Sequence, residues 1–197
     1  VIHMEIGATK AVQDRLKTTK IEESKGASLV FCWDTHLTKI KGRNVLFIVN
    51  ASNRYTIAMT DIEPRNWNYY TMYIRSVIHG VMQEMGYSED QIGQYFKMSG
   101  DTTVTKTHGR KSVGGINRMV MDAQYFGKKL EKEAKYQWEL SEYLNRDICQ
   151  PEGFDAYGYP SELFKLDMER LGIAAKRKPA KIIDFTKYID TNRSTNH

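Results

Sequence analysis

Cysteine, proline and long apolar runs are all scarce in this chain of 197 residues. The two cysteines, Cys32 in an apolar run and Cys149 before a proline, lack the paired spacing of a disulfide framework or a zinc motif. No stretch reaches the roughly 18 apolar residues of a membrane-spanning helix, and no basic segment leads into an apolar one as in a secretory signal. These absences argue against secreted disulfide-rich and membrane classes, and we expect a cytoplasmic protein with reduced cysteines and no membrane partner.

The composition that is present is that of a globular protein, with 41% hydrophobic and 27% charged residues. A chain of 22.8 kDa buries about 70% of its surface on folding, so it needs no metal or disulfide to be stable. We also expect no cofactor. We interpret residues 1–3 as an expression remnant and residues 4–172 as a single domain, mainly strands over 4–62 and mainly helices over 63–172. Residues 173–197 form a basic tail that ends in a short apolar peptide.

The hydrophobic pattern predicts an α+β fold. Short apolar or alternating runs, typical of strands, occupy 4–9, 28–33, 36–40, 44–50 and 54–60. Helical spacing of apolar residues predicts helices over 64–85, 88–100, 112–133, 134–148 and 161–171. We therefore expect an antiparallel sheet in the N-terminal third, covered by a cluster of helices and followed by the basic tail.

The net charge of +5 is unevenly distributed. Residues 97–118 contain five basic residues and one acidic residue, and residues 174–197 contain six and two. Two short basic segments on a body of mixed charge suit a polyanion or an acidic protein surface as partner. The alternative is that this charge only confers solubility.

The segment 101–118 has the most unusual composition of the chain. Basic and polar residues surround a predicted helix start, and Gly114 and Gly115 lie in the first turn. Exposed N–H groups at a helix N-terminus favour anions, so this segment predicts a phosphate site, although close helix packing explains the glycines equally well. The predicted nucleic-acid-binding residues are Lys106, His108, Arg110, Lys111, Ser112 and Asn117, together with Lys176, Arg177, Lys178 and Lys181 in the tail.

The five histidines have no metal-ligand spacing, so we predict no metal site. His36, near the end of an apolar strand, and His108 are the candidate catalytic residues, because two imidazoles can act as acid and base in phosphodiester cleavage. The alternative is that they are two unrelated imidazoles. His79 lies in the apolar stretch of a long predicted helix and is interpreted as a core or boundary residue.

Three motifs resemble those of a domain-of-unknown-function family of bacterial, plasmid and phage proteins. They are Met4-Glu5-Ile6-Gly7-Ala8-Thr9-Lys10, Trp33-x-x-His36-Leu37 with the following 43–50, and Lys106-Thr107-x-x-Arg110-Lys111-Ser112-Val113-x-Gly115-x-Asn117. In the family pattern the Arg is followed directly by Ser-Val, whereas here Lys111 intervenes and leaves open which basic residue takes the family position. The resemblance implies an α/β sandwich and a link to mobile genetic elements. Similar domains occur among plasmid-encoded type II-A anti-CRISPR proteins, which inhibit Cas9 through its guide RNA.

We therefore expect a mobile-element-encoded inhibitor of the Cas9 type, which contacts guide RNA or the effector complex in the cytoplasm of a bacterial host cell. A first alternative is a metal-independent ribonuclease that uses His36 or His108, with Arg110 stabilising the phosphorane. A second alternative is an interaction protein without a nucleic-acid role, whose tyrosine-rich helices form a homodimer.

Overall fold

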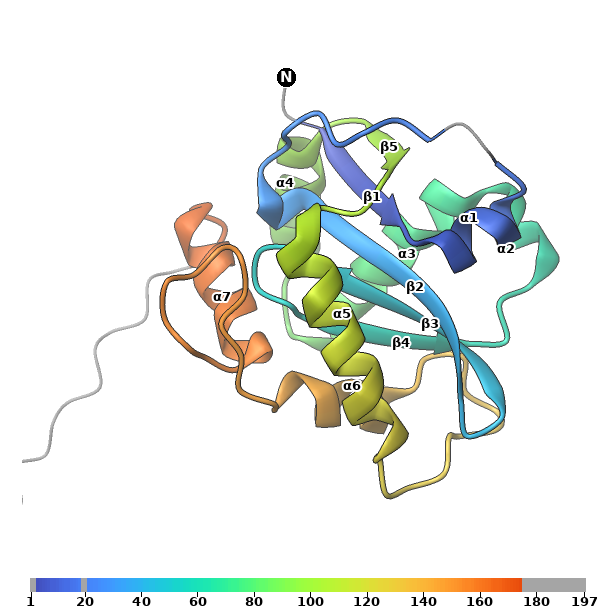
Figure 1. Ribbon diagram of the computed structural model, residues 1–197. Coiled ribbons are helices and arrows are strands. Elements are labelled where there is room, and N and C mark those ends of the chain that lie inside the picture. The colour runs from blue at the N-terminus through green and yellow to red at the C-terminus, as the bar shows by residue number, and fades with distance from the viewer. Residues whose placement is uncertain (1–2, 19–20, 175–197) are drawn as a thin grey trace, which may run out of the picture.

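The computed structural model describes residues 3–18 and 21–174 (Figure 1). The predicted tail residues Lys176, Arg177, Lys178 and Lys181 lie outside the described residues. The α+β class is confirmed, with the sheet formed mainly in the N-terminal part of the chain.

The sheet has five strands in the order β4-β3-β2-β1-β5, and it is mixed. Strands β2 (Cys32–Ile40), β3 (Arg43–Asn50) and β4 (Thr56–Thr60) are antiparallel neighbours. Strand β1 (Met4–Ala8) instead runs parallel to both β2 and β5 (Thr102–Thr105). The prediction of a wholly antiparallel sheet is therefore wrong. Parallel pairs require long crossover connections, which leave no turn signal in the sequence.

The second strand differs from its prediction at its start. Leu29–Phe31 is a short 3-10 helix (η1), and β2 begins at Cys32. From there β2 stays paired with β3 from Trp33 opposite Asn50 to Ile40 opposite Arg43, so the separately predicted run 36–40 belongs to the same strand.

The helices follow the predicted order with shifted ends, except that the helix predicted over 64–85 is interrupted at Tyr69 and forms two helices. The bounds are α1 (Lys10–Leu16), α2 (Pro64–Asn68), α3 (Tyr70–Glu84), α4 (Glu89–Ser99), α5 (Gly109–Gln124), α6 (Trp138–Asn145) and α7 (Pro160–Arg170). The predicted helices over 112–133 and 134–148 are both too long, because residues 125–137 form a connection between α5 and α6. Within the part of the chain that the structure describes, no helix has the length and apolar character needed to span a membrane.

Two hydrophobic cores lie on opposite faces of the sheet (Figure 1). Helices α3, α4 and α7 cover the first face, where the buried residues include Ile6, Trp33, Ile48, Ile74, Tyr95 and Phe164. Helices α5 and α6 cover the second face, where they include Phe47, Val49, Ala58, Ile116, Met119 and Leu140. Alternation along a strand places every second side chain on the second face, so Glu5 of β1 and Asp34 of β2 point toward the N-terminal end of α5.

Side chains of α6 cover the outer edge of β4. The Asn145 side chain accepts a hydrogen bond from Thr56 N and donates one to Thr56 O, each at 2.8 Å. Ser141 Oγ accepts from Ala58 N at 3.0 Å. Helix α6 thus satisfies backbone groups that an edge strand would otherwise present to another chain.

Candidate functional site at the start of helix α5

Glu5, Asp34 and His108 form a buried ionic cluster on the second face of the sheet. They come from β1, β2 and the connection between β5 and α5, and their side chains are at most 3% exposed. His108 Nδ1 lies 2.7 Å from Asp34 Oδ1, and His108 Nε2 lies 2.9 Å from Glu5 Oε2. The imidazole ring therefore bridges two carboxylates that belong to neighbouring parallel strands.

Asp34 connects strand β2 to the first turn of α5. Its carboxylate accepts hydrogen bonds from the Ser112 hydroxyl and from the backbone N–H of His108, the latter at 3.2 Å. A carboxylate at this position also interacts favourably with the positive end of the helix dipole. Asp34 thus fixes where α5 begins, three residues before the predicted start.

Gly7 makes room for this arrangement on β1. A Cβ atom at this position would overlap the Asp34 carboxylate and would lie 3.0 Å from Thr107 Cα. The absence of a side chain therefore allows the connection between β5 and α5 to cross β1 closely.

Glu5 is held in its ionised form. Burial alone would raise its pKa, but hydrogen bonds outweigh this effect and lower the pKa to about 2. Ser24 Oγ donates to Glu5 at 2.6 Å and Lys25 N at 2.8 Å, and His3 Nε2 lies 2.6 Å from the same carboxylate. With His108, these groups surround the carboxylate oxygens almost completely.

His108 is held in its protonated form. Burial alone would lower its pKa, but the hydrogen bonds to Asp34 and then Cys32, with the nearby charge of Asp34, outweigh burial and raise the pKa to about 11. A general base must exchange a proton near neutral pH and reach the substrate. An imidazolium that is 3% exposed and bound at both nitrogens does neither, so His108 acts in this arrangement as a structural cation.

His36 has different partners from His108. Its Nδ1 lies 3.1 Å from Thr9 Oγ1, and burial lowers its pKa. His36 and Asp34 lie two residues apart on the same face of β2, but among the described residues no hydrogen bond joins the two imidazoles. The two imidazoles thus have separate partners, Thr9 for His36 and the carboxylates of Asp34 and Glu5 for His108.

The predicted anion-binding residues separate into two groups. His108 and Ser112 turn inward to Asp34, whereas Arg110 and Asn117 are exposed. Lys106 pairs with Glu23, and Lys111 Nζ lies 3.8 Å from Glu152. The six residues therefore do not share one face of the helix start, and the folded chain brings distant acidic residues beside the two lysines.

The two glycines of α5 have different surroundings. A Cβ at Gly115 would lie 2.7 Å from the Arg54 guanidinium, whose Nη2 donates to Gly115 O at 2.7 Å. Close packing therefore accounts for Gly115. A Cβ at Gly114 would meet no described atom within 4 Å, so packing does not account for the second glycine.

The solvent side of α5 carries a continuous row of exposed polar, basic and apolar side chains. We call this row the α5 outer face, and it consists of Arg110, Lys111, Gly114, Asn117, Arg118, Met121 and Tyr125 just beyond the helix. Met121 is 59% exposed and Tyr125 is 79% exposed. With a rise of about 1.5 Å per residue, this face extends over roughly 22 Å.

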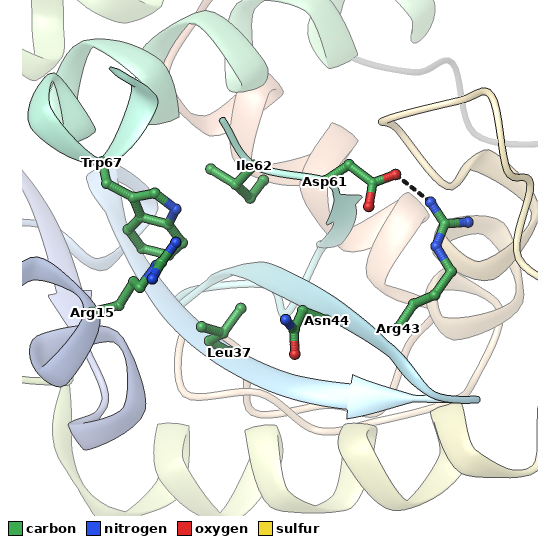
Figure 2. Close-up of a pocket in the computed structure, with 7 residues that line it drawn as sticks. All are labelled: Arg15, Leu37, Arg43, Asn44, Asp61, Ile62 and Trp67. Atoms are coloured by element: carbon green, nitrogen blue, oxygen red, sulfur yellow. Dashed lines mark hydrogen bonds and ion pairs between the residues drawn. The ribbon is translucent and has the colours of Figure 1, made fainter. Parts of the chain in front are cut away.

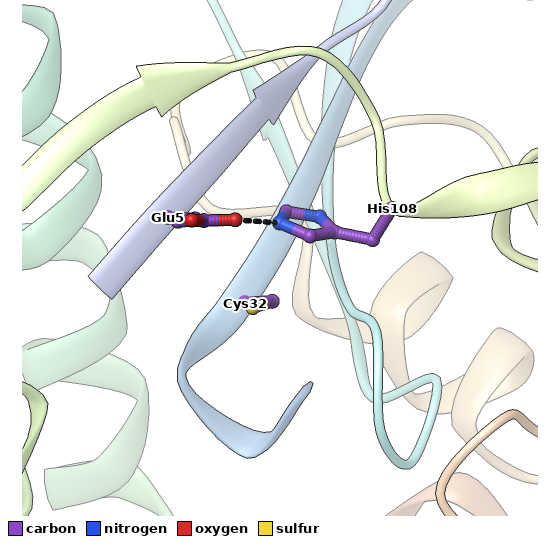
Figure 3. Close-up of side chains that lie close together, drawn as sticks. All are labelled: Glu5, Cys32 and His108. Atoms are coloured by element: carbon purple, nitrogen blue, oxygen red, sulfur yellow. Dashed lines mark hydrogen bonds and ion pairs between the residues drawn. The ribbon is translucent and has the colours of Figure 1, made fainter. Parts of the chain in front are cut away.

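Cys32 lies beside the ionic cluster, although no sequence pattern links it to His108. Glu5, Cys32 and His108 each offer one metal-ligand atom, and these atoms lie within 4.8 Å of one another (Figure 3). The three residues are far apart in the sequence, so no spacing motif could indicate the group. Only the parallel pairing of Glu5 with Cys32 across β1 and β2 brings their side chains together.

A separate polar pocket of about 330 Å³ lies near α1 and α2 (Figure 2). It is lined by Arg15, Leu37, Arg43, Asn44, Asp61, Ile62 and Trp67. Arg43 pairs with Asp61 and donates to Glu131 O at 2.7 Å, and the Arg15 guanidinium lies 5.5 Å from the centre of the Trp67 ring. Both arginines are thus engaged by neighbouring groups.

The comparisons with known proteins give one match. The model of a family described as a domain of unknown function (DUF6933) matches residues 5–163. This range contains Glu5, Cys32, Asp34 and His108, and the whole of α5. No curated protein matches the chain, and no solved structure matches it.

Proposed function

The chain belongs to this family of domains of unknown function, and we propose that it is a non-catalytic RNA-binding module that inhibits a Cas9-type effector by contacting its guide RNA. The α5 outer face is the observation that carries the proposal. It presents Arg110, Lys111 and Arg118 on one side of a rigid helix, with Asp122 as the acidic neighbour of Arg118 at 3.1 Å.

The side chains of this face suit single-stranded RNA. Arginine and lysine neutralise phosphates, and an exposed aromatic ring such as Tyr125 stacks on a base. Gly114 lies between the cationic end and the aromatic end of the face and lets a ligand approach the helix backbone. The resemblance to plasmid-encoded inhibitors of Cas9 is the reason for choosing guide RNA as the ligand.

The state of His108 favours binding over cleavage. The ribonuclease alternative requires an accessible imidazole that exchanges protons, whereas His108 is buried between Asp34 and Glu5. Arg110, its proposed assistant in cleavage, points to solvent from the first turn of α5. No observation in the described residues favours a catalytic role, so we do not put this alternative forward.

Fluorescence anisotropy with labelled guide RNA, alone and bound to Cas9, tests the proposal. The triple variant Arg110→Ala/Lys111→Ala/Arg118→Ala should lower the log–log salt slope of binding by about 2, because each phosphate contact on a single strand contributes about 0.7. The matched control Lys10→Ala/Arg65→Ala/Lys165→Ala removes three exposed charges from α1, α2 and α7 and should leave the affinity within about twofold.

DNA cleavage by the effector, read on the same samples, completes the test. The wild-type protein and the control should reduce cleavage while the guide RNA keeps its length. Undetectable binding at about 50 mM salt with and without Cas9, or equal binding by both triple variants, would overturn the proposal. Shortened RNA would show that the protein is a nuclease instead.

A further inference from the structure

We propose that Glu5, Cys32 and His108 form a Zn²⁺ site, in which Glu5 contributes a carboxylate oxygen, Cys32 its sulfur and His108 its Nε2. This inference is independent of the proposed RNA binding, because the site lies on the buried side of α5. Figure 3 shows the three side chains converging from β1, β2 and the start of α5.

The nitrogen and oxygen ligands require only a small adjustment. In a tetrahedral zinc site with bonds of about 2.0 Å to nitrogen and oxygen, these two ligand atoms lie roughly 3.3 Å apart. His108 Nε2 and Glu5 Oε2 are 2.9 Å apart, so they would separate by about 0.4 Å. The ligand atoms of all three residues already lie within 4.8 Å of one another.

The surrounding hydrogen bonds are those of a zinc site. Ligand histidines usually donate their second N–H to a carboxylate, which fixes the ring and its tautomer. Here His108 Nδ1 lies 2.7 Å from Asp34 Oδ1, and Asp34 is itself held by Ser112. Glu5 is oriented in the same way by Ser24 Oγ and Lys25 N.

The charges of the site also balance. The metal would replace the proton on His108 Nε2 and the thiol proton of Cys32. The two positive charges of Zn²⁺ would thus take the place of the two protons that are released. The cluster then keeps the same net charge with Zn²⁺ as without it, and burying the ion adds no net charge to the interior.

The donor set identifies the class of metal. One nitrogen, one sulfur and one carboxylate oxygen suit a borderline-soft ion such as Zn²⁺, whereas Mg²⁺ and Ca²⁺ prefer oxygen ligands throughout. Three protein ligands leave a fourth position for a water molecule. The imidazole of His3 lies on the other oxygen of the same carboxylate, with its Nε2 2.6 Å from Glu5 Oε1.

Titration of the full-length, chelator-treated protein with Co²⁺ tests the site, because tetrahedral Co²⁺ gives visible bands and a thiolate ligand adds a near-ultraviolet charge-transfer band. We expect one equivalent of Co²⁺, displaced by Zn²⁺, in the wild-type protein. Cys149→Ser changes the other, half-buried cysteine and should leave both bands unchanged. Cys32→Ser should lose the charge-transfer band, with circular dichroism confirming that the variant is folded.

Asp34→Asn provides a second test that keeps all three ligands. Loss of a carboxylate that orients a ligand histidine typically weakens metal binding by about 10- to 100-fold. Absence of tetrahedral bands in the wild-type protein would overturn the proposal. So would a charge-transfer band that survives in folded Cys32→Ser and disappears in Cys149→Ser.

Discussion

The two sides of α5 use similar residue types for opposite purposes. On the inner side, His108 is surrounded by Asp34 and Glu5, and all three side chains are buried. On the outer side, Arg110 is exposed and Arg118 has one exposed ion pair with Asp122. The difference shows that charge near a helix N-terminus does not by itself indicate a ligand site, because the fold decides which charges are already neutralised.

Substitutions on the two sides of α5 should therefore have different effects. Breaking a buried charge pair leaves an ion without compensation and costs several kcal/mol, whereas exposed pairs contribute little. The inner side should therefore determine the free energy of unfolding, and the outer side should determine binding.

The largest expected effect is that of Asp34→Asn. The substitution keeps the shape of the side chain but removes the charge that faces His108 and the first turn of α5. We expect the free energy of unfolding to fall by about 3 kcal/mol in urea denaturation with chelator present. The matched control Asp122→Asn breaks an exposed pair with Arg118 and should change it by less than about 0.5 kcal/mol. Equal losses of unfolding free energy in the two variants would show that the inner side of α5 does not contribute more to stability than the outer side.

Glycine positions on the two sides should respond in opposite directions. Gly7→Ala forces apart the Asp34 carboxylate and the backbone at Thr107 and should destabilise the protein by about 1–3 kcal/mol. Gly114→Ala meets no described atom and improves helix propensity, so it should stabilise the protein by about 0.5–1 kcal/mol. Thermal unfolding of the two variants measures the difference, and stabilisation by Gly7→Ala would show that β1 and α5 are less closely packed than described.

His108 and Glu5 should contribute to the free energy of unfolding over different pH ranges. Because the pKa of His108 rises from 6.5 unfolded to about 11 folded, the native state binds the extra proton and stability falls as pH rises through this range. One such group gives a slope of up to about 1.4 kcal/mol per pH unit. Glu5 acts in the opposite direction, because its pKa falls from 4.5 to about 2 and its contribution is lost as pH falls through that window.

Urea denaturation of the metal-free protein between pH 7 and 9 measures the alkaline slope, which should flatten in His108→Gln. His79→Gln is the matched control, because the side chain of His79 is partly exposed and lies 3.1 Å from Glu89 at the surface. A slope that is unchanged in His108→Gln would show that another group binds the proton.

The smallest expected effect concerns the outer face. Glu152 lies 3.8 Å from Lys111, with both side chains about half exposed. Glu152→Gln should therefore leave the unfolding free energy within about 0.5 kcal/mol but strengthen RNA binding by about twofold to fivefold at low salt. Glu169→Gln on α7 removes an equal charge elsewhere and should leave the affinity unchanged. Weaker binding by Glu152→Gln would indicate that Lys111 does not face the RNA.

The sequence predicted local features better than distant ones. The start of α4, close to the predicted start at residue 88, has a capping box in which Gln91 N donates to Ser88 Oγ at 3.3 Å and Ser88 N donates to Gln91 Oε1 at 2.9 Å. The sequence pattern does not predict strand β5, because Thr102–Thr105 has no apolar alternation. Its partner, β1, also lies far away in the sequence. These are interactions that no local pattern encodes.

The candidate site shows the same limit. The composition of the segment around His108 is unusual, and we predicted from it that all the cationic residues bind one nucleic-acid ligand. Asp34 lies two residues before His36 in the sequence, and its interaction with His108 depends on Gly7 and on the parallel pairing of β1 with β2. No spacing links Glu5 and Cys32 to His108 in the sequence, because residues from three distant segments form no recognisable motif.

The side-chain amide of Asn145 forms the two hydrogen bonds with Thr56 that a neighbouring strand would otherwise form. By occupying Thr56 N and O, it ends the ladder on that border of the sheet, and on the opposite border Glu22 bridges to Thr105. A β-strand from another molecule could pair with either border only after it displaced Asn145 from Thr56 or Glu22 from Thr105. Within the described residues, these contacts therefore disfavour edge-to-edge pairing of the sheet at Thr56 and at Thr105.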